Sequence, residues 1–128
     1  MMLLADSEFV IALSRRPGSA IRTRADSFLE RHATATLYIS RVTTCEVSAG
    51  FTRRQDAAAV LQGFTPLEID DDVAWQASRI ARELKGKGQH IGDNDVWIAA
   101  TAMAYGLPVV SNNARHLGRV KGLELRAY

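Results

Sequence analysis

Short apolar runs alternate along the chain with longer stretches of helical periodicity. The apolar runs cover residues 2–5, 37–40, 67–69 and 107–110, and a weaker one covers 123–126. Helices are predicted between them at residues 7–18, 19–32, 43–51, 57–61, 73–85 and 93–105, with a brief turn at 114–117. Strands that alternate with helices form crossover units. The sequence therefore predicts an α/β fold, with a mainly parallel sheet and helices on both of its faces.

The last long helix begins inside residues 91–103, which read IGDNDVWIAATAM. Gly92 permits an unusual backbone turn, and two aspartates follow it before an alanine-rich apolar run. Asp93 is predicted to be the N-cap, which puts Asp95 in the first turn, near the positive end of the helix dipole. Two capping acids on a core helix would explain this pattern without any chemistry. A functional interpretation requires acidic neighbours for Asp95.

Polar side chains recur where the predicted strands end. Asp6 follows the first strand, Glu46 lies in the first turns of the helix after the second, and Asn113 lies just beyond the fourth. In parallel α/β sheets, ligands bind beyond the carboxyl ends of the strands. We expect these three side chains to share that edge, and Asp95 can be brought to the same place.

Each of these residues also has an ordinary structural explanation. Asp6 and Asn113 are common turn residues. Glu46 stands three residues after Thr43, which is the spacing of a capping box. The three aspartates at 70–72 are interpreted as charges at the start of a helix, on a solvated face. The functional hypothesis depends on all the strand-end acids together and not on any one of them.

Carboxylates that gather without partners raise one another's pKa, and a divalent cation relieves that repulsion. A site built from oxygen ligands, without cysteine or histidine, favours Mg²⁺ or Mn²⁺ over zinc. Such a site suits phosphodiester hydrolysis, because the cation activates water and neutralises developing charge. The three histidines, His32, His90 and His116, show no ligand-like spacing and are assigned no chemistry.

The composition constrains the class of protein only loosely. The 128 residues suit one domain spanning 1–128, and the net charge is only +2. All but three of the 16 basic residues are arginine, which grips phosphate well but is also common in GC-rich genomes. The single cysteine, Cys45, excludes an internal disulfide, fits a reducing cytoplasm and is expected to be buried. No signal peptide or membrane span is apparent. Trp75 and Trp97 are interpreted as core or interface residues.

Four segments together resemble a PIN domain of the VapC toxin type. They are LLADS at 3–7, ISRVTTCEVSAG at 39–50, IGDNDVWIAA at 91–100, and VVSNNARHL at 109–117 with GL at 122–123. The resemblance implies a three-layer α/β/α sandwich and Mg²⁺-dependent endoribonuclease activity on RNA such as tRNA or rRNA. The oxygen ligands would also accept Mn²⁺ as a substitute. It also implies a homodimer and an inhibitory VapB-like antitoxin.

The resemblance assigns a role to each strand-end residue. Asp6, Glu46 and Asp95 match the family's three acids; Asp6 and Asp95 are expected to hold Mg²⁺, and Glu46 to orient or deprotonate the attacking water. Ser7 and Asn113 are expected to hold these side chains in position. Many relatives carry a further acid at the position of Asn113, so the number of metal ions is open, whether one or two.

Five arginines are candidates for gripping the RNA backbone, although ordinary surface charge would also explain them: Arg15, Arg16, Arg53, Arg54 and Arg115. The alternative function is a non-catalytic RNA-binding or regulatory module on the same scaffold, which would keep the arginines and would not need the acids. A signalling receiver or phosphatase also carries acids at strand ends. It would additionally want a lysine near the pocket, and the only lysines near a motif are Lys85 and Lys87.

Overall fold

The computed structural model describes residues 1–128, and its centre is one five-stranded sheet in the order β3-β2-β1-β4-β5. The strands are β1 (Met2–Ala5), β2 (Thr36–Ser40), β3 (Thr65–Leu67), β4 (Val109–Val110) and β5 (Leu125–Arg126). Every neighbouring pair is parallel. The predicted α/β fold with a parallel sheet is confirmed. Because β1 lies at the centre, its carboxyl end is flanked by the ends of β2 and β4.

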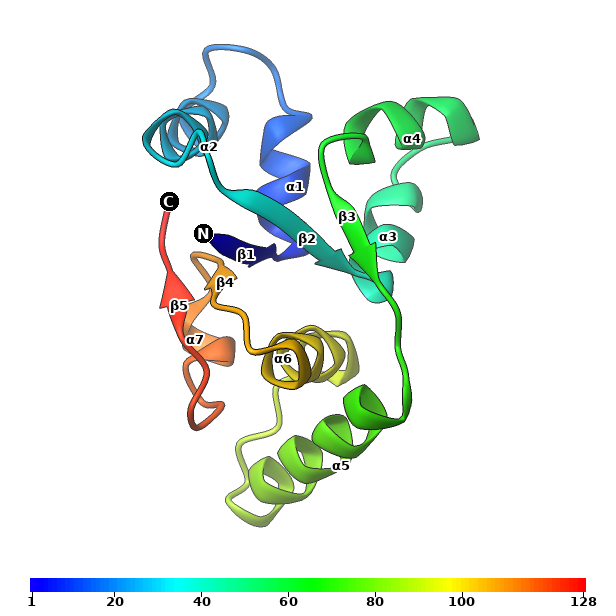
Figure 1. Cartoon of the computed structure of the whole chain (residues 1–128), viewed down its shortest axis with the longest axis vertical. Coiled ribbons are helices and arrows are strands. Elements are labelled where there is room, and N and C mark those ends of the chain that lie inside the picture. Colours follow the sequence, from blue (N-terminus) through cyan, green and yellow to red (C-terminus); the bar gives the residue numbers. More distant parts are fainter.

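Helices cover both faces of the sheet and complete a three-layer sandwich (Figure 1). On one face lie α1 (Ser7–Leu13), α2 (Ala20–Arg31), α3 (Arg41–Ser48) and α4 (Arg54–Leu61). On the other lie α5 (Asp71–Gly86), α6 (Asp93–Tyr105) and the short α7 (Ala114–Leu117). No helix is both long and apolar enough to cross a bilayer.

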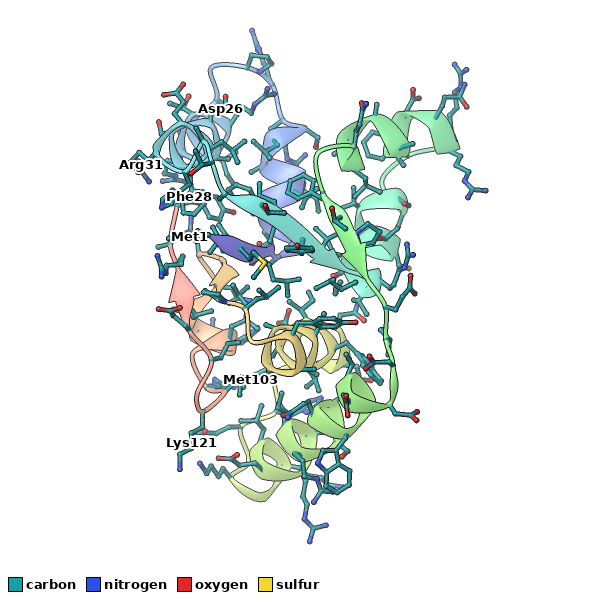
Figure 2. The ribbon with its side chains drawn as sticks, in the orientation of Figure 1. Met1, Asp26, Phe28, Arg31, Met103 and Lys121 are labelled. Atoms are coloured by element: carbon teal, nitrogen blue, oxygen red, sulfur yellow. The ribbon has the colours of Figure 1, made fainter.

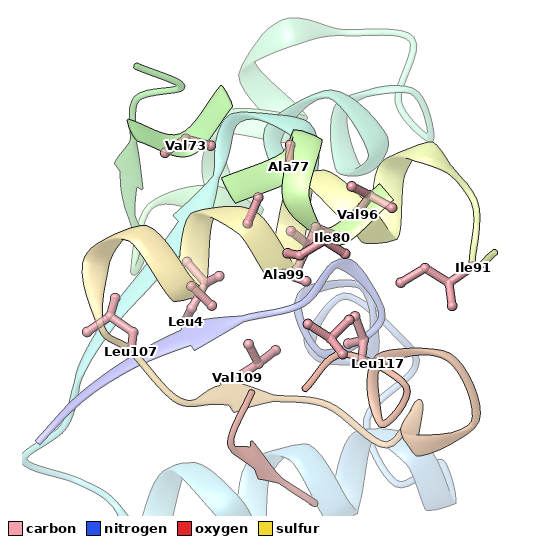
Figure 3. Close-up of a cluster of buried hydrophobic side chains, with 14 of the residues drawn as sticks. Leu4, Val73, Ala77, Ile80, Ile91, Val96, Ala99, Leu107, Val109 and Leu117 are labelled. Carbon is pink, nitrogen blue, oxygen red and sulfur yellow. The ribbon is translucent and has the colours of Figure 1, made fainter. Parts of the chain in front are cut away.

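Two separate apolar cores follow from the alternation of side chains along the central strands. Leu4 and Val109 point toward α5 and α6, where they pack with residues such as Ile80 and Ala99 (Figure 3). Leu3, Ala5 and Val110 point to the opposite face and join the core beneath α1 and α2, which includes Phe9 and Phe28. Side chains fill the space on both sides of the sheet (Figure 2). The sheet is thus fixed from both faces, and this fixes the positions of its strand ends.

Three helix starts position residues of the predicted site. Asp6 caps α1, because its side chain accepts a hydrogen bond from the backbone N–H of Phe9. Ser40 caps α3, so the helix begins before Thr43 and the predicted capping box of Thr43 with Glu46 is wrong. Gly92 stands at the N-cap of α6 with φ of 93° and no side-chain cap bond, so Asp93 is not the cap. The predicted end of this helix at residue 105 is confirmed, and Gly106 caps it with a left-handed φ of 68°.

Other differences concern the edges and the outer surface. Helix α1 ends at Leu13, well before residue 18, and Ser14 closes it by donating to the carbonyl of Ile11. Strand β3 begins at Thr65 and includes Pro66, which lacks an N–H and is tolerated on an edge strand. Cys45 is exposed and not buried, because it lies between Thr43 and Val47, whose spacing defines the inward face of α3.

Candidate active site

Asp6 is placed at the centre of the sheet edge by both β1 and α1. Its backbone N–H donates to the carbonyl of Val110 at 3.1 Å, which joins it to β4. Its Oδ1 accepts from the N–H of Phe9 at 2.8 Å, and only 4% of the residue is exposed. A carboxylate is therefore held almost buried where β1 ends.

Glu46 reaches the same edge from α3 and is held by a chain of buried hydroxyls. Ser7 Oγ lies 2.6 Å from Glu46 Oε1 and 3.1 Å from Thr43 Oγ1, and Thr43 Oγ1 lies 3.2 Å from Ser40 Oγ. A hydroxyl has one proton and a carboxylate can only accept. The bonds therefore run in one direction: Ser40 donates to Thr43, Thr43 to Ser7, and Ser7 to Glu46.

Asp95 lies in the first turn of α6, and its side chain contacts His116 of α7. Its Oδ2 lies 3.4 Å from Nδ1 of His116. Partial burial raises the pKa of Asp95, and the charge on Glu46 acts in the same direction, while His116 opposes both. Asp95 and Glu46 are thus close enough to influence each other electrostatically.

One hollow of about 420 Å³ unites the residues that the sequence singled out. Its lining includes the predicted acids Asp6, Glu46 and Asp95 and the predicted supporting residues Ser7 and Asn113. Asn113 also caps α7, since its Oδ1 accepts from the N–H of His116 at 3.4 Å. The structure therefore places all five of these residues at one site, although they come from four separate parts of the sequence.

Three further polar residues of the hollow were not predicted: Glu8, Asn112 and His116. Asn112 forms two bonds of 2.8 Å with the backbone of Tyr128, donating to its carbonyl and accepting from its N–H. His116 was assigned no chemistry because only its spacing from other residues along the chain was considered. The signal that could have found it is its place three residues after Asn113, beyond the same strand.

The electrostatics of the hollow favour a cation. Burial raises the pKa of Asp6 from 3.8 to about 6, and the charges on Glu8 and Asp95 add to that rise. The Ser111 hydroxyl and the N–H of Phe9 act against it. These acids repel one another in a partly buried site, and a divalent ion would remove that cost.

The donor set suits a hard divalent ion, although no three acidic, histidine or cysteine side chains already form a closed metal cluster. Mg²⁺ retains several waters and needs only one or two carboxylates directly. Asp6 and Asp95, which both line the polar hollow, meet that requirement without forming a cage.

Only one of the five candidate arginines belongs to this hollow. Arg115 lines it, whereas Arg54 lines a separate hollow beside α3 and α4. Arg15 and Arg16 are exposed beyond the end of α1 that points away from Asp6. Arg53 is exposed where α4 begins. The structure does not gather these arginines around the site, and their contact with RNA remains a prediction.

Comparison with known proteins agrees with this fold. The PIN domain family matches residues 3–123. The tRNA(fMet)-specific endonuclease VapC of Salmonella typhimurium is 32% identical over 99 residues, which are 72% of this chain and 75% of that protein. Ribonuclease VapC1 of Methanocaldococcus jannaschii is 35% identical over 65 residues, and that match spans only about half of each protein, 51% and 48%.

Among solved structures, VapBC2 of Rickettsia felis, bound to a DNA fragment from its promoter, superposes with a TM-score of 0.84. It is 21% identical, and the match covers 99% of this chain and 98% of that one. At this identity the likeness supports the fold alone. The chain belongs to the PIN domain family, and within it to the VapC group.

Proposed function

We propose that this protein is a metal-dependent endoribonuclease and the toxin of a VapBC-type toxin–antitoxin pair. The observation that carries the proposal is the single hollow shared by Asp6, Glu46 and Asp95. The Salmonella typhimurium and Methanocaldococcus jannaschii relatives are named as RNA-cleaving enzymes, and the Rickettsia felis neighbour is a complex of the VapBC type. The proposal includes an antitoxin partner similar to VapB and a homodimer.

Asp6 and Asp95 would hold Mg²⁺, or Mn²⁺ in its place, in the hollow. A bound divalent cation supplies Lewis-acid chemistry, since it neutralises charge on the phosphate and lowers the pKa of water. Asp6 is suited to this role because it is fixed to β4 and α1 and cannot turn away. Asn113 also lines the hollow, and its amide oxygen, which caps α7, is a neutral ligand atom that adds no charge.

Glu46 would receive the proton of the attacking water. Ser7 donates to Oε1, and Oε2 has no hydrogen-bond partner within the chain. The bond from Ser7 fixes the direction in which Oε2 faces. Arg115, which lines the same hollow, would contact a phosphate of the RNA.

The target is proposed to be a structured RNA such as tRNA or rRNA. The name of the Salmonella typhimurium relative makes initiator tRNA the first substrate to test. Mapping new RNA ends after expression of the toxin would identify the substrate and the bond that is cut.

The deciding experiment compares Asp6→Asn and Glu46→Gln with Asp93→Asn as a matched control. Asp93 is an acid of the same helix turn as Asp95, but its side chain is 91% exposed, pairs with His90 and does not line the hollow that contains Asp6. With Mg²⁺ present, the first two variants should lose RNA cleavage by roughly 100-fold or more, and the control should cleave normally. If Asp6→Asn still binds and cleaves RNA like the unaltered protein, the nuclease hypothesis is wrong. If no form cleaves but all bind RNA, the non-catalytic RNA-binding module is supported instead.

A further inference from the structure

The hollow contains one nitrogen side chain that faces an acid directly. His116 Nδ1 lies 3.4 Å from Asp95 Oδ2, the side chain is 40% exposed, and His116 lines the hollow. The short helix α7 that carries His116 is anchored at both ends. Asn113 caps its start, and Leu117 is only 1% exposed in the core. The position of the histidine is therefore built into the fold and does not depend on a mobile surface chain.

Apart from Arg115, which cannot bind a cation, every other side chain with a donor atom in the hollow offers oxygen. Mg²⁺ strongly prefers oxygen ligands, whereas divalent transition-metal ions accept imidazole nitrogen as well. We infer that His116 acts beside Asp95 as a nitrogen ligand of the bound cation and makes this site favour Mn²⁺ over Mg²⁺. This inference rests on the proposed function, because it requires that Asp95 holds a cation.

The main alternative is that His116 only orients the Asp95 carboxylate. In that case the imidazole would be hydrogen-bonded to the acid, and the metal would be coordinated by oxygen atoms alone. Loss of the ring would then weaken Mg²⁺ and Mn²⁺ binding to the same extent. If the nitrogen binds the metal directly, loss of the ring weakens Mn²⁺ binding more than Mg²⁺ binding. The ¹⁴N nucleus of the bound imidazole also couples magnetically to the electron spin of the manganese.

The chain supplies a matched control in a second histidine–aspartate pair. His90 Nε2 lies 3.6 Å from Asp93 Oδ1, and both side chains are largely exposed, at 52% and 91%. Neither residue lines the hollow that contains Asp6 and His116. Replacing His90 therefore removes the same kind of contact without touching the proposed metal site.

The test uses Mn²⁺ and the purified full chain as the unaltered protein, His116→Gln and His90→Gln. Electron paramagnetic resonance titration gives the Mn²⁺ Kd, and competition gives the Mg²⁺ Kd. Pulsed measurements detect ¹⁴N coupling from an imidazole bound to manganese. We expect this coupling in the unaltered protein and in His90→Gln, and its loss in His116→Gln. We also expect Mn²⁺ affinity to fall at least about tenfold in His116→Gln, with a smaller fall for Mg²⁺.

Two results would overturn the inference while leaving the nuclease hypothesis intact. One is bound Mn²⁺ without ¹⁴N coupling in the unaltered protein, and the other is an equal loss of both metals in His116→Gln. Asp6→Asn should remove Mn²⁺ binding in either case, which shows that the observed ion occupies this hollow. If the unaltered protein neither binds Mn²⁺ nor cleaves RNA, the proposed function and the inference both fail. Thermal unfolding of His116→Gln controls for folding, and His116→Ala provides a second variant.

Discussion

Ser7 and Glu46 are joined by a hydrogen bond of 2.6 Å between side chains 39 positions apart in the sequence. Ser7 stands in the first turn of α1, and Glu46 lies on α3, so the bond crosses between two helices that follow neighbouring strands. Because Thr43 donates to Ser7 from behind, the serine proton is directed at the carboxylate. Glu46 is therefore oriented by partners that are themselves buried, and its direction does not depend on solvent.

Replacing Ser7 with alanine should slow RNA cleavage without removing the metal site. Glu46 would keep its charge but lose its fixed orientation, and misplacement of a catalytic group costs roughly 10- to 100-fold in rate. Single-turnover cleavage at saturating metal would measure this effect. Ser14→Ala is the control, because Ser14 also makes a 2.6 Å bond, to the carbonyl of Ile11, at the far end of α1. Equal rates for both variants would show that the bond to Glu46 is unimportant.

The stability of the metal-free protein should fall as pH rises through the titration of Asp6. Burial raises the pKa of Asp6 from 3.8 to about 6, so the folded state disfavours the ionised form. Below pH 3.8 the carboxyl is protonated in both the folded and the unfolded state, so the folded state carries no cost of burying a charge. Between these two pKa values the unfolding free energy should decline by up to about 3 kcal/mol and then level off.

Urea unfolding in a chelator at several pH values, compared with Asp6→Asn, isolates this contribution. Asparagine is an equally good N-cap, so the variant keeps the start of α1 while removing the charge. Asp95 also has a raised pKa, so part of the pH dependence remains in the variant. The difference in unfolding free energy between the two proteins should change over this pH range. A constant difference would show that burial of Asp6 has little energetic effect.

The positions of the acids could be predicted because they depend on topology. Asp6 directly follows β1 and Asn113 lies three residues beyond β4. In a parallel sheet the strand ends share one edge, so both residues could be placed without knowing how side chains pack. Glu46 was correctly placed at the site, but the reason for its orientation was missed. Glu46 is hydrogen-bonded to Ser7, which is 39 residues away, whereas a capping box would have paired it with Thr43, three residues away.

The role of the histidine and the cysteine could not be obtained from local patterns. His116 meets Asp95 only because α6 and α7 pack against the same end of the sheet, and a test of spacing along the chain ignores such contacts. Cys45 was expected to be buried from the general habit of its residue type, yet the inward face of α3 is occupied by Thr43 and Val47. The start of α6 was also set by the backbone of Gly92 and not by an aspartate cap.

A divalent cation should stabilise the protein by binding the folded state alone. At a concentration of 100 times its Kd, such a ligand adds about 2.7 kcal/mol to the unfolding free energy. Thermal unfolding with Mg²⁺ or Mn²⁺, each compared with a chelator, would reveal this as a rise in Tm. Asp95→Asn should lose most of the rise, whereas Asp93→Asn, which alters an exposed acid of the same turn, should keep it. A rise that is equal in all three proteins would indicate weak binding elsewhere on the surface.

Arg115 is the arginine whose loss should most affect RNA binding. It is the only one of the five candidates that lines the hollow with Asp6 and Asp95. Replacement by glutamine should weaken binding to different RNA sequences to a similar degree, because a phosphate contact carries no base information. It should also reduce the slope of log affinity against log salt by roughly one, as expected for one lost contact.

Arg79→Gln is the matched control, since Arg79 stacks on Trp75 of α5, at 4.3 Å from the ring centre, away from the hollow. Filter binding to a catalytically inactive Asp6→Asn background at several salt concentrations would separate binding from cleavage, and an unchanged slope for Arg115→Gln would remove this residue from the RNA interface.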